Sequence, residues 1–197
     1  MKGIKRLVAG CSVGVALGLG SMGVSAADYV FDTEGAHAFV QFRIKHLGYS
    51  WLYGRFQKFD GRFSFDEANP SATTVEASVD MTSLDSDHAE RDKHLRGDNF
   101  LNVDKYSTAT FKSTAYEMTG ENTGKLKGDL MLYGNTLPIT IDVEHIGGGP
   151  DPWGGYRQGF EGRATINPAD FGLDLTKALG PSAAEVELML TVEGIRQ

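Results

Sequence analysis

Histidine and carboxylate side chains that could perform acid–base chemistry gather in two short stretches of the sequence. His46 begins a segment rich in aromatic residues, while Asp92 and His94 lie in a charged stretch at residues 85–96. Histidine titrates near neutral pH and is the commonest general base, so these three groups could serve a hydrolase or an isomerase. The sequence has no G-x-S-x-G nucleophile elbow and no glycine-rich phosphate loop between a strand and a helix. We therefore predict that the protein is not an enzyme, and keep catalysis as the alternative.

The charged stretch also contains metal-ligating residue types, but their spacing argues against a metal site. His88 and His94 are six residues apart, whereas a metal-binding helix usually spaces its histidines three or four apart. Asp85 to Asp87 is similar to the start of a calcium loop, yet Glu90 stands where that loop needs glycine and Arg96 where it needs glutamate. We predict no metal site and no required cofactor.

The order of charges in residues 86–95 predicts a short helix. Acidic residues come early and basic residues late, which complements the helix dipole. Gly97 follows as a stop signal, and Asp85 or Ser86 is the expected N-cap.

Most of the remaining sequence alternates apolar and polar residues with a period of two. This pattern is typical of antiparallel strands that bury one face. The expected inward faces are formed by Ala38, Val40, Phe42, Ile44 and His46; by Val75, Ala77, Val79 and Met81; by Leu126, Gly128, Leu130 and Leu132; by Leu137, Ile139, Ile141 and Val143; by Phe160, Gly162, Ala164 and Ile166; and by Val186, Leu188, Leu190 and Val192.

With Arg55 to Phe65 and Thr108 to Met118, the sequence predicts about eight strands. We expect a hairpin turn at Tyr133–Thr136, because Gly and Asn accept positive φ, and a loop at residues 147–152. An even number of antiparallel strands leaves no open edge when it closes into a barrel, and eight strands enclose either a packed core or one small ligand. We predict an all-β, single eight-stranded antiparallel barrel with a short helix near residues 86–95; a β-sandwich is the structural alternative.

The N-terminus has the three parts of a secretory signal. Residues 1–6 are basic, residues 7–20 are apolar and small apart from one serine, and Val24–Ala26 offers small side chains for a signal peptidase. We predict that residues 1–26 are a cleaved signal peptide, that residues 27–197 form one mature domain, and that this domain works outside the cytoplasm.

Two alternatives concern this N-terminal segment. A membrane anchor is disfavoured because the apolar stretch is shorter than the roughly 20 residues of a membrane span. Leu7 to Cys11 is similar to a lipoprotein cleavage box, but cleavage there would leave an apolar core shorter than the roughly 7 to 15 residues of an export signal. Cleavage after Ala26 would remove the only cysteine and with it disulfides, thiolate metal sites and cysteine nucleophiles.

Acidic residues outnumber basic ones by 26 to 19, for a net charge of −7. Loss of Lys2, Lys5 and Arg6 with the signal makes the mature domain more acidic still. Nucleic acids and anionic lipid surfaces both attract a basic face. The overall charge therefore argues against a nucleic-acid partner and against adhesion to anionic lipid surfaces.

Several short motifs occur in a specific order along nearly the whole mature chain. They are Phe42 to Tyr53, Gly54-Arg55-Phe56, Phe59-Asp60-Gly61, Glu90 to Arg96, Asp98 to Leu101, Tyr106 with Ala109-Thr110-Phe111, Gly128-Asp129-Leu130 and Asp151-Pro152-Trp153-Gly154. Their joint order resembles the YceI-like family of periplasmic polyisoprenoid-binding proteins. The resemblance implies a lipocalin-like barrel, a periplasmic location, and a long isoprenoid chain, often a quinone tail, held in an apolar pore.

An isoprenoid chain needs an extended apolar sheath, because each exposed CH₂ costs about 0.8 kcal/mol. By default the inward apolar face would be a packed core; the resemblance implies that it lines a pore. Polar groups at the mouth of this pore would meet the head group, and the candidates are Arg91, His94 and His46, with Trp153 as a stacking lid. The predicted ligand-binding residues are Val40, Phe42, Ile44, His46, Trp51, Tyr53, Phe63, Val79, Arg91, His94, Leu95, Phe100, Phe111, Leu130, Leu132, Ile141, Trp153, Phe160, Leu188 and Leu190.

We predict a protein that stores, shields or transports a polyisoprenoid or isoprenoid quinone. Transient membrane contact and a homodimer both stay open. The remaining alternative is a solid-core stress or interaction module without a ligand. Whichever function holds, we expect the adjacent Arg91 and Asp92 to stabilise the helix and its seat on the barrel; Trp51 and Trp153 could equally be plugs of the barrel.

Overall fold

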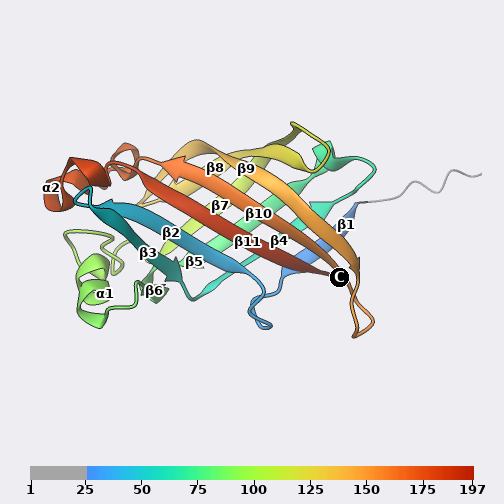
Figure 1. Cartoon of the computed structure of the whole chain (residues 1–197), viewed down its shortest axis with the longest axis horizontal. Helices are drawn as coiled ribbons and strands as arrows, with labels where there is room; N and C mark the ends of the chain where they lie inside the picture. Colours follow the sequence, from blue (N-terminus) through green and yellow to red (C-terminus); the bar gives the residue numbers. More distant parts are fainter. Residues whose placement is uncertain (1–25) are drawn as a thin grey trace, which may run out of the picture.

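The computed structural model describes residues 26–197, which form a closed β-barrel with short helices at one end (Figure 1). The predicted signal peptide up to residue 25, and with it Cys11, lies outside the described residues. The strands are β1 (Ala27–Phe31), β2 (Phe39–His46), β3 (Ser50–Phe56), β4 (Phe59–Phe65), β5 (Thr74–Asp80), β6 (Leu84–Asp85), β7 (Thr108–Met118), β8 (Thr123–Leu132), β9 (Asn135–Pro150), β10 (Tyr156–Ile166) and β11 (Val186–Arg196).

The barrel closes in the order β1-β4-β5-β7-β8-β9-β10-β11, with β11 pairing back onto β1. Every pairing is antiparallel, and the closing register sets Tyr29 opposite Arg196 and Phe31 opposite Gly194. Closure satisfies the backbone groups that a sheet edge would expose. The predicted all-β, eight-stranded antiparallel barrel is confirmed.

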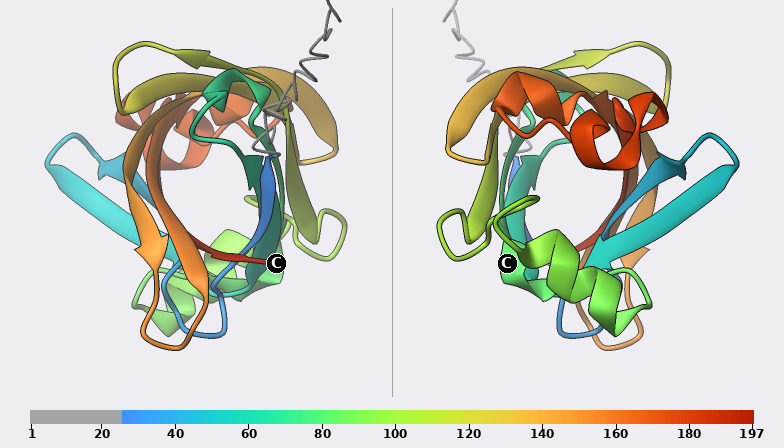
Figure 2. Two further views of the ribbon diagram at one scale, coloured as in Figure 1. Left: turned by 90° about the vertical axis from the view of Figure 1, so that its right-hand side faces the viewer. Right: turned by 90° about the vertical axis from the view of Figure 1, so that its left-hand side faces the viewer.

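More than eight strand segments arise because two strands are interrupted. The C-terminal part of β11 pairs with β1, and its N-terminal part, from Val186 to Thr191, pairs with β2. Only Gln57 and Lys58 separate β3 from β4, and β6 pairs only with the last two residues of β3. The β2–β3 hairpin therefore leans away from the barrel wall, as both views in Figure 2 show.

Two short helices flank the same end of the barrel: α1 (Ala89–Arg96) and α2 (Thr176–Leu179) (Figures 1 and 2). Single turns of 3₁₀-helix occur at Pro70–Ala72, Met81–Ser83, Pro168–Phe171 and Pro181–Ala183. Within the part of the chain that the structure describes, no helix combines the length and apolar character needed to span a bilayer.

The predicted helix and its stop at Gly97 are confirmed, but its expected N-cap is wrong. His88 is the N-cap, and its Nδ1 accepts a hydrogen bond from the Arg91 amide at 3.1 Å. The helix cannot start earlier because Asp87 has a positive φ of 59°. The Ser86 hydroxyl, offered in the sequence as a cap, donates instead to Asp92.

The turn between β8 and β9 is as predicted, whereas the expected loop at residues 147–152 is mostly strand. Tyr133 and Gly134 have φ values of 52° and 78°, typical of a two-residue hairpin. Strand β9 runs on to Pro150, with Gly148 opposite Gln158 in β10. A Cβ at Gly148 would overlap the Gln158 amide, so here glycine makes room for a neighbouring side chain.

Glycines in the barrel wall lie beside aromatic rings of neighbouring strands. A Cβ at Gly54, for example, would overlap the ring of Phe42, its cross-strand partner. The missing side chain lets the ring lie flat along the wall, as in aromatic rescue of a glycine. Consequently these rings line the interior without filling it. The other pairs are Phe31 with Gly61, Phe63 with Gly194, Phe111 with Gly128, and Tyr116 with Gly124.

The barrel end opposite the helices is packed with aromatic side chains. Tyr29 stacks on Phe63 at 4.8 Å, and Phe160 meets Phe65 edge-on at 5.1 Å. Gln158, only 1% exposed, is hydrogen-bonded within the same region, so its buried amide is satisfied. This end therefore forms a floor beneath the barrel interior.

Candidate ligand cavity and its mouth

A cavity of about 790 Å³ occupies the barrel interior, and its lining includes residues of both α1 and α2. These two helices lie at the same end of the barrel (Figure 2), so we take that end as the mouth of the cavity. Strands β2, β5, β8 and β11 direct alternate side chains into it, as period-two geometry requires. Arg91 and His94 of α1 and Lys177 of α2 stand at its rim. The site is thus an apolar chamber with a polar mouth.

A second cavity of about 180 Å³ lies deeper in the barrel, towards the aromatic floor. Its lining is almost entirely apolar. Val40, Val79, Leu130 and Leu188 line both cavities. The two cavities therefore adjoin at a ring formed by these four side chains.

Most predicted ligand-binding residues line these cavities, and their binding role stays a prediction. The structure brings together residues from eight strands and α1 that are far apart in the sequence. The larger cavity is lined by Val40, Phe42, Ile44, His46, Val79, Arg91, His94, Leu95, Phe100, Leu130, Leu132 and Leu188, and the deeper one also by Phe63, Phe111, Ile141, Phe160 and Leu190.

Trp51, Tyr53 and Trp153 line neither cavity. Trp51 and Tyr53 alternate with Leu52, which faces inward, so their side chains point outward; Trp51 packs against the Arg43 guanidinium at 4.2 Å. Trp153 is 75% exposed on the β9–β10 loop, at the end of the barrel away from the helices (Figure 1). The predicted placement of Trp153 as a lid over the mouth is therefore wrong.

The sequence pattern missed the segment from Leu173 to Leu179, which lines the mouth opposite α1. It forms a bend and a single helical turn, so no period of two or 3.6 develops along it. Four of its seven residues, Leu173, Leu175, Ala178 and Leu179, are apolar, and this composition is the signal that the sequence offers. Further lining residues outside the prediction are Lys45, Leu52, Phe56, Met81, Leu84, Asn99, Leu101, Ala109, Ile166, Pro168 and Val186.

A hydrogen-bond network holds α1 at the rim. The buried Asp92 carboxylate accepts hydrogen bonds from the Ser86 amide, at 2.9 Å, and from the Ser86 hydroxyl. The Nε of Arg91 donates to the Ser86 Oγ at 2.8 Å. Arg91 and Asp92 thus seat the helix, as expected from the sequence, while Arg91 also faces the cavity.

The three groups considered for acid–base catalysis do not form a relay. The Asp92 carboxylate is engaged by Ser86, and the His94 ring packs edge-on against Phe100 at 4.8 Å. His46 lies across the mouth on β2. In this arrangement His46 and His94 contribute polar groups at the rim.

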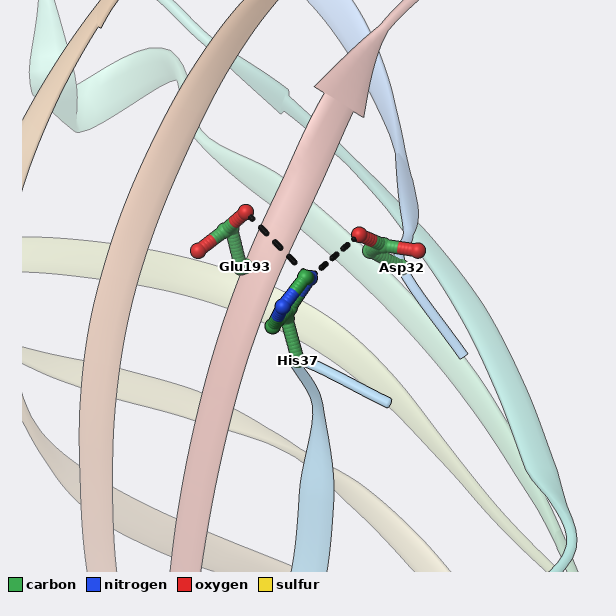
Figure 3. Close-up of side chains that lie close together, drawn as sticks. All are labelled: Asp32, His37 and Glu193. Atoms are coloured by element: carbon green, nitrogen blue, oxygen red, sulfur yellow. Dashed lines mark hydrogen bonds and ion pairs between the residues drawn. The ribbon is translucent and has the colours of Figure 1, made fainter. Parts of the chain in front are cut away.

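Asp32, His37 and Glu193 form a separate cluster of titratable groups (Figure 3). They lie after β1 and near the end of β11, at the end of the barrel away from α1 and α2 (Figure 1). The His37 Nδ1 is 2.8 Å from Asp32 Oδ2 and 3.8 Å from Glu193 Oε1. The Nη1 of Arg157 lies 2.5 Å from each of the same two carboxylate oxygens. These hydrogen bonds, first from Arg157 and then from His37, lower the pKa of Asp32 to about 2.

This cluster contains metal-ligating side-chain types, whose ligand atoms lie within 4.8 Å of one another. The guanidinium of Arg157 already bonds both carboxylates and also Asp151 at 2.9 Å, and these contacts raise the pKa of Arg157. The arrangement is therefore a network of ion pairs that links the segment after β1 to β10 and β11. Sequence reasoning could not find it, because its members are scattered between residues 32 and 193.

Known proteins share both the sequence and the fold. Residues 29–194 match the model of the YceI-like domain. The chain is 54% identical over 194 residues to a UPF0312 protein of Ectopseudomonas mendocina and 55% identical to one of Pseudomonas aeruginosa. Each alignment covers 98% of this chain and 100% of the relative.

Solved structures show the same barrel. A Campylobacter jejuni YceI protein superposes with a TM-score of 0.69 at 28% identity, covering 78% of this chain and 90% of that one. Burkholderia cenocepacia BcnA gives 0.74 at 22% identity, covering 83% and 98%. A polyisoprenoid binding domain from Saccharophagus degradans gives 0.62 at 16% identity, covering 87% and 99%. The last two share the fold alone. The matches in sequence agree with the barrel and its cavity, and the chain belongs to the family of YceI-like domains.

Proposed function

We propose that the protein binds a polyisoprenoid or the tail of an isoprenoid quinone and holds it for storage, shielding or transport in the periplasm. The observation that carries the proposal is the pair of adjoining apolar cavities inside the barrel. An extended apolar space suits a long, flexible chain better than a compact ligand, because the chain can bury its whole length.

The composition of the mouth supports a lipid with a polar head. Lys45, His46, Arg91 and His94 all stand where the larger cavity meets solvent, with Asn99 beside them. Cationic and hydrogen-bond-donating groups suit the carbonyl oxygens of a quinone or the oxygens of a phosphate. The tail would then point towards the aromatic floor and the head towards α1 and α2.

A structural neighbour supports the ligand class. The Saccharophagus degradans domain with the same fold is described as binding polyisoprenoids. We carry that ligand class over because the lining of this barrel is apolar along its length. The proposed role is that of a carrier, with no chemistry performed by the protein.

Lipid extraction tests the proposal. The exported protein is purified, extracted with organic solvent, and analysed by mass spectrometry for isoprenoid lipids; the stripped protein is then titrated with a detergent-solubilised isoprenoid quinone. Leu130→Glu, which places a charge at the ring joining the two cavities, should abolish binding. Met131→Glu is the matched control, because the next residue of a strand faces the opposite side. Absence of both co-purified and added lipid from the wild-type protein would reject the carrier.

Two further measurements address the compartment and the enzymatic alternative. Mass spectrometry of the mature N-terminus should show a protein that begins after Ala26; a diacylated Cys11 would show a tethered lipoprotein instead. Turnover of an added ester or lipid that is lost in His94→Ala would favour an enzyme over a carrier.

A further inference from the structure

The β2–β3 hairpin exposes a row of large apolar side chains beside the cavity mouth. Leu47 is 53% exposed and Tyr49 is 87% exposed, and the outward-facing Trp51 and Tyr53 continue the row along β3. The hairpin leans out from the barrel (Figure 2), and exposed fractions of 36% at Trp51 and 53% at Tyr53 leave the rest of the row open to solvent as well. Exposed aromatic and aliphatic side chains in one contiguous row mark an interaction surface.

The tip of this hairpin carries an apolar residue in a conformation that favours glycine. Leu47 has a φ of 54°, and Gly48 beside it has a φ of 80°. A bulky residue rarely adopts a positive φ, and such a conformation costs free energy. The exposed side chain of Leu47 gains little burial in the barrel to offset that cost. The turn accounts for this conformation, because Leu47 and Gly48 have nearly the same φ values as Tyr133 and Gly134 in the β8–β9 hairpin. A partner that buries Leu47 would account for its exposure.

The charge around this row differs from that of the whole protein. Residues 39–58 contain Arg43, Lys45, Arg55 and Lys58 and no acidic residue, although the chain has 26 acids. Arg43 is paired with Glu187, whereas the ammonium of Lys45 lies over the Trp51 ring at 5.5 Å. Aromatic side chains interleaved with lysine and arginine are typical of surfaces that contact the head-group region of a membrane.

The row is continuous with the mouth. Lys45 and His46, which immediately precede Leu47, line the larger cavity. The tip also reaches the end of α2, because a Cβ at Gly180 would lie 4.0 Å from the Leu47 side chain. A water-insoluble lipid could thus pass between bilayer and cavity with little exposure of its tail to solvent. This matters because each CH₂ group exposed to water costs about 0.8 kcal/mol.

We propose that the β2–β3 hairpin docks the cavity mouth onto an anionic phospholipid surface. Leu47, Tyr49 and Trp51 insert among the head groups, and Lys45 contacts the anionic lipids. The inference rests on the proposed carrier function and names the partner from which the carrier takes its ligand, but it is measured separately below.

A second copy of the chain is the competing occupant. The edge of β3 that faces away from β2 is paired only at Arg55 and Phe56, within the described residues, so a strand could add there. The membrane is favoured because the row combines tryptophan and tyrosine with an acid-free basic segment and adjoins the cavity mouth.

Tryptophan fluorescence tests the docking, because the sequence contains only Trp51 and Trp153. In the full-length exported protein, Trp153→Phe leaves Trp51 on the hairpin as reporter, and Trp51→Phe leaves Trp153 at the opposite end as the matched control. Vesicles of phosphatidylethanolamine and phosphatidylglycerol with brominated acyl chains should blue-shift and quench Trp51 and leave Trp153 unchanged. Equal responses of both tryptophans, or of neither, would overturn the proposal.

Substitutions at the tip provide a second test. Lys45→Gln should lower partitioning onto these vesicles about fivefold, the effect of one basic residue near an anionic surface. Leu47→Ser with Tyr49→Ser should lower it by about tenfold or more, because both apolar side chains are lost from the interface. Ile146→Ser is the control, since Ile146 is comparably exposed on β9. Unchanged partitioning of the tip variant, or an equal loss in the control, would contradict docking through this hairpin.

Two controls separate this inference from its rivals. Sedimentation without vesicles measures self-association; a blue shift of Trp51 that follows protein concentration would assign the hairpin to a second copy and overturn the proposal. Quinone binding from detergent should be unchanged in the Leu47→Ser/Tyr49→Ser variant, because neither residue lines a cavity. If the wild-type protein binds quinone but does not dock onto vesicles, the docking inference alone is rejected. If it docks but does not bind quinone, the proposed carrier function is rejected, and with it this role for docking.

Discussion

The Nη1 of Arg157 lies 2.5 Å from the Oδ2 of Asp32, and this ion pair ties the segment after β1 to β10. Asp32 is 4% exposed, and its backbone amide also donates to the carbonyl of Glu193 at 2.8 Å. Strand β1 closes the barrel through only a few residues of β11. The pair therefore reinforces the seam at which the barrel is closed.

Asp32→Asn should destabilise the protein by about 2–3 kcal/mol, because it leaves a partly buried arginine with one charged partner fewer. Urea unfolding followed by circular dichroism measures the change. Asp28→Asn, an exposed aspartate on β1, should change the free energy of unfolding by less than about 0.5 kcal/mol. Similar losses in both variants would show that the effect is one of net charge and not of the pair.

The same pair makes stability depend on acid pH. The pKa of Asp32 is lowered from 3.8 to about 2, chiefly by Arg157. A carboxyl whose pKa is lower in the folded state contributes stability above its unfolded pKa, and this contribution is lost as pH falls through the folded pKa. The difference in free energy of unfolding between wild type and Asp32→Asn should therefore shrink between about pH 4 and pH 2. A constant difference across that range would be inconsistent with the pair.

The ring that joins the two cavities should set how long a lipid tail the barrel accepts. Val79→Phe narrows the passage to the deeper cavity, since Val79 lines both. We expect affinity for short isoprenoid chains to change less than about threefold and affinity for long chains to fall at least about tenfold, because the excess chain is left in water. Titration with a series of chain lengths measures the effect. Equal loss for every length would indicate a general packing defect.

Gly54 should control the volume of the larger cavity without lining it. Gly54→Ala pushes the Phe42 ring off the wall, and such overpacking typically costs about 1–3 kcal/mol. We expect both lower stability and weaker lipid binding, measured by unfolding and by titration. Gly149→Ala is the matched control, because a Cβ there meets no atom within 4 Å. Restored binding in Gly54→Ala with Phe42→Leu would confirm that the displaced ring is the cause.

The rim helix should loosen when its buried acceptor is removed. Asp92→Ala leaves the Ser86 amide and hydroxyl without their acceptor, at a cost of about 1–3 kcal/mol. Hydrogen exchange in residues 86–96 should accelerate more than in the strands, and lipid should dissociate faster. Glu90→Ala, an exposed acid on the same helix, should leave both rates nearly unchanged. Uniform acceleration across the whole barrel would instead indicate global destabilisation.

The sequence predicted the inward faces because a residue every second position must share one side of a strand. Phe42 and Leu130 accordingly line the cavity. The alternation of apolar and polar residues could not predict that the interior is hollow. That depends on cross-strand register, which sets Gly54 opposite Phe42 and Gly128 two residues from Leu130, the residue opposite Phe111. Register is a property of pairs of strands and is absent from any single one.

The errors in the prediction also have physical causes. Gly147–Gly149 was assigned to a loop because glycine is usually a turn residue, but at Gly148 it accommodates the side chain of Gln158. Trp153 was placed at the mouth because an aromatic residue in a flexible loop could cover a pocket. Which end of a barrel a loop occupies depends on strand count and direction, and a chain whose strands are interrupted at Asp32–Ala38 obscures that count.

The aromatic floor has a consequence for how such a carrier exchanges its cargo. A tube open at both ends could thread a lipid from one bilayer to another, but a tube with a packed base must load and unload through the same opening. The lipid would enter with the far end of its tail first and leave with its head group first. The proposed carrier would therefore have to bring the same mouth to the donor membrane and then to the acceptor membrane. Such a carrier would shuttle between membranes and would not form a continuous channel. Net transfer would run from the membrane that holds the lipid less tightly to the one that holds it more tightly.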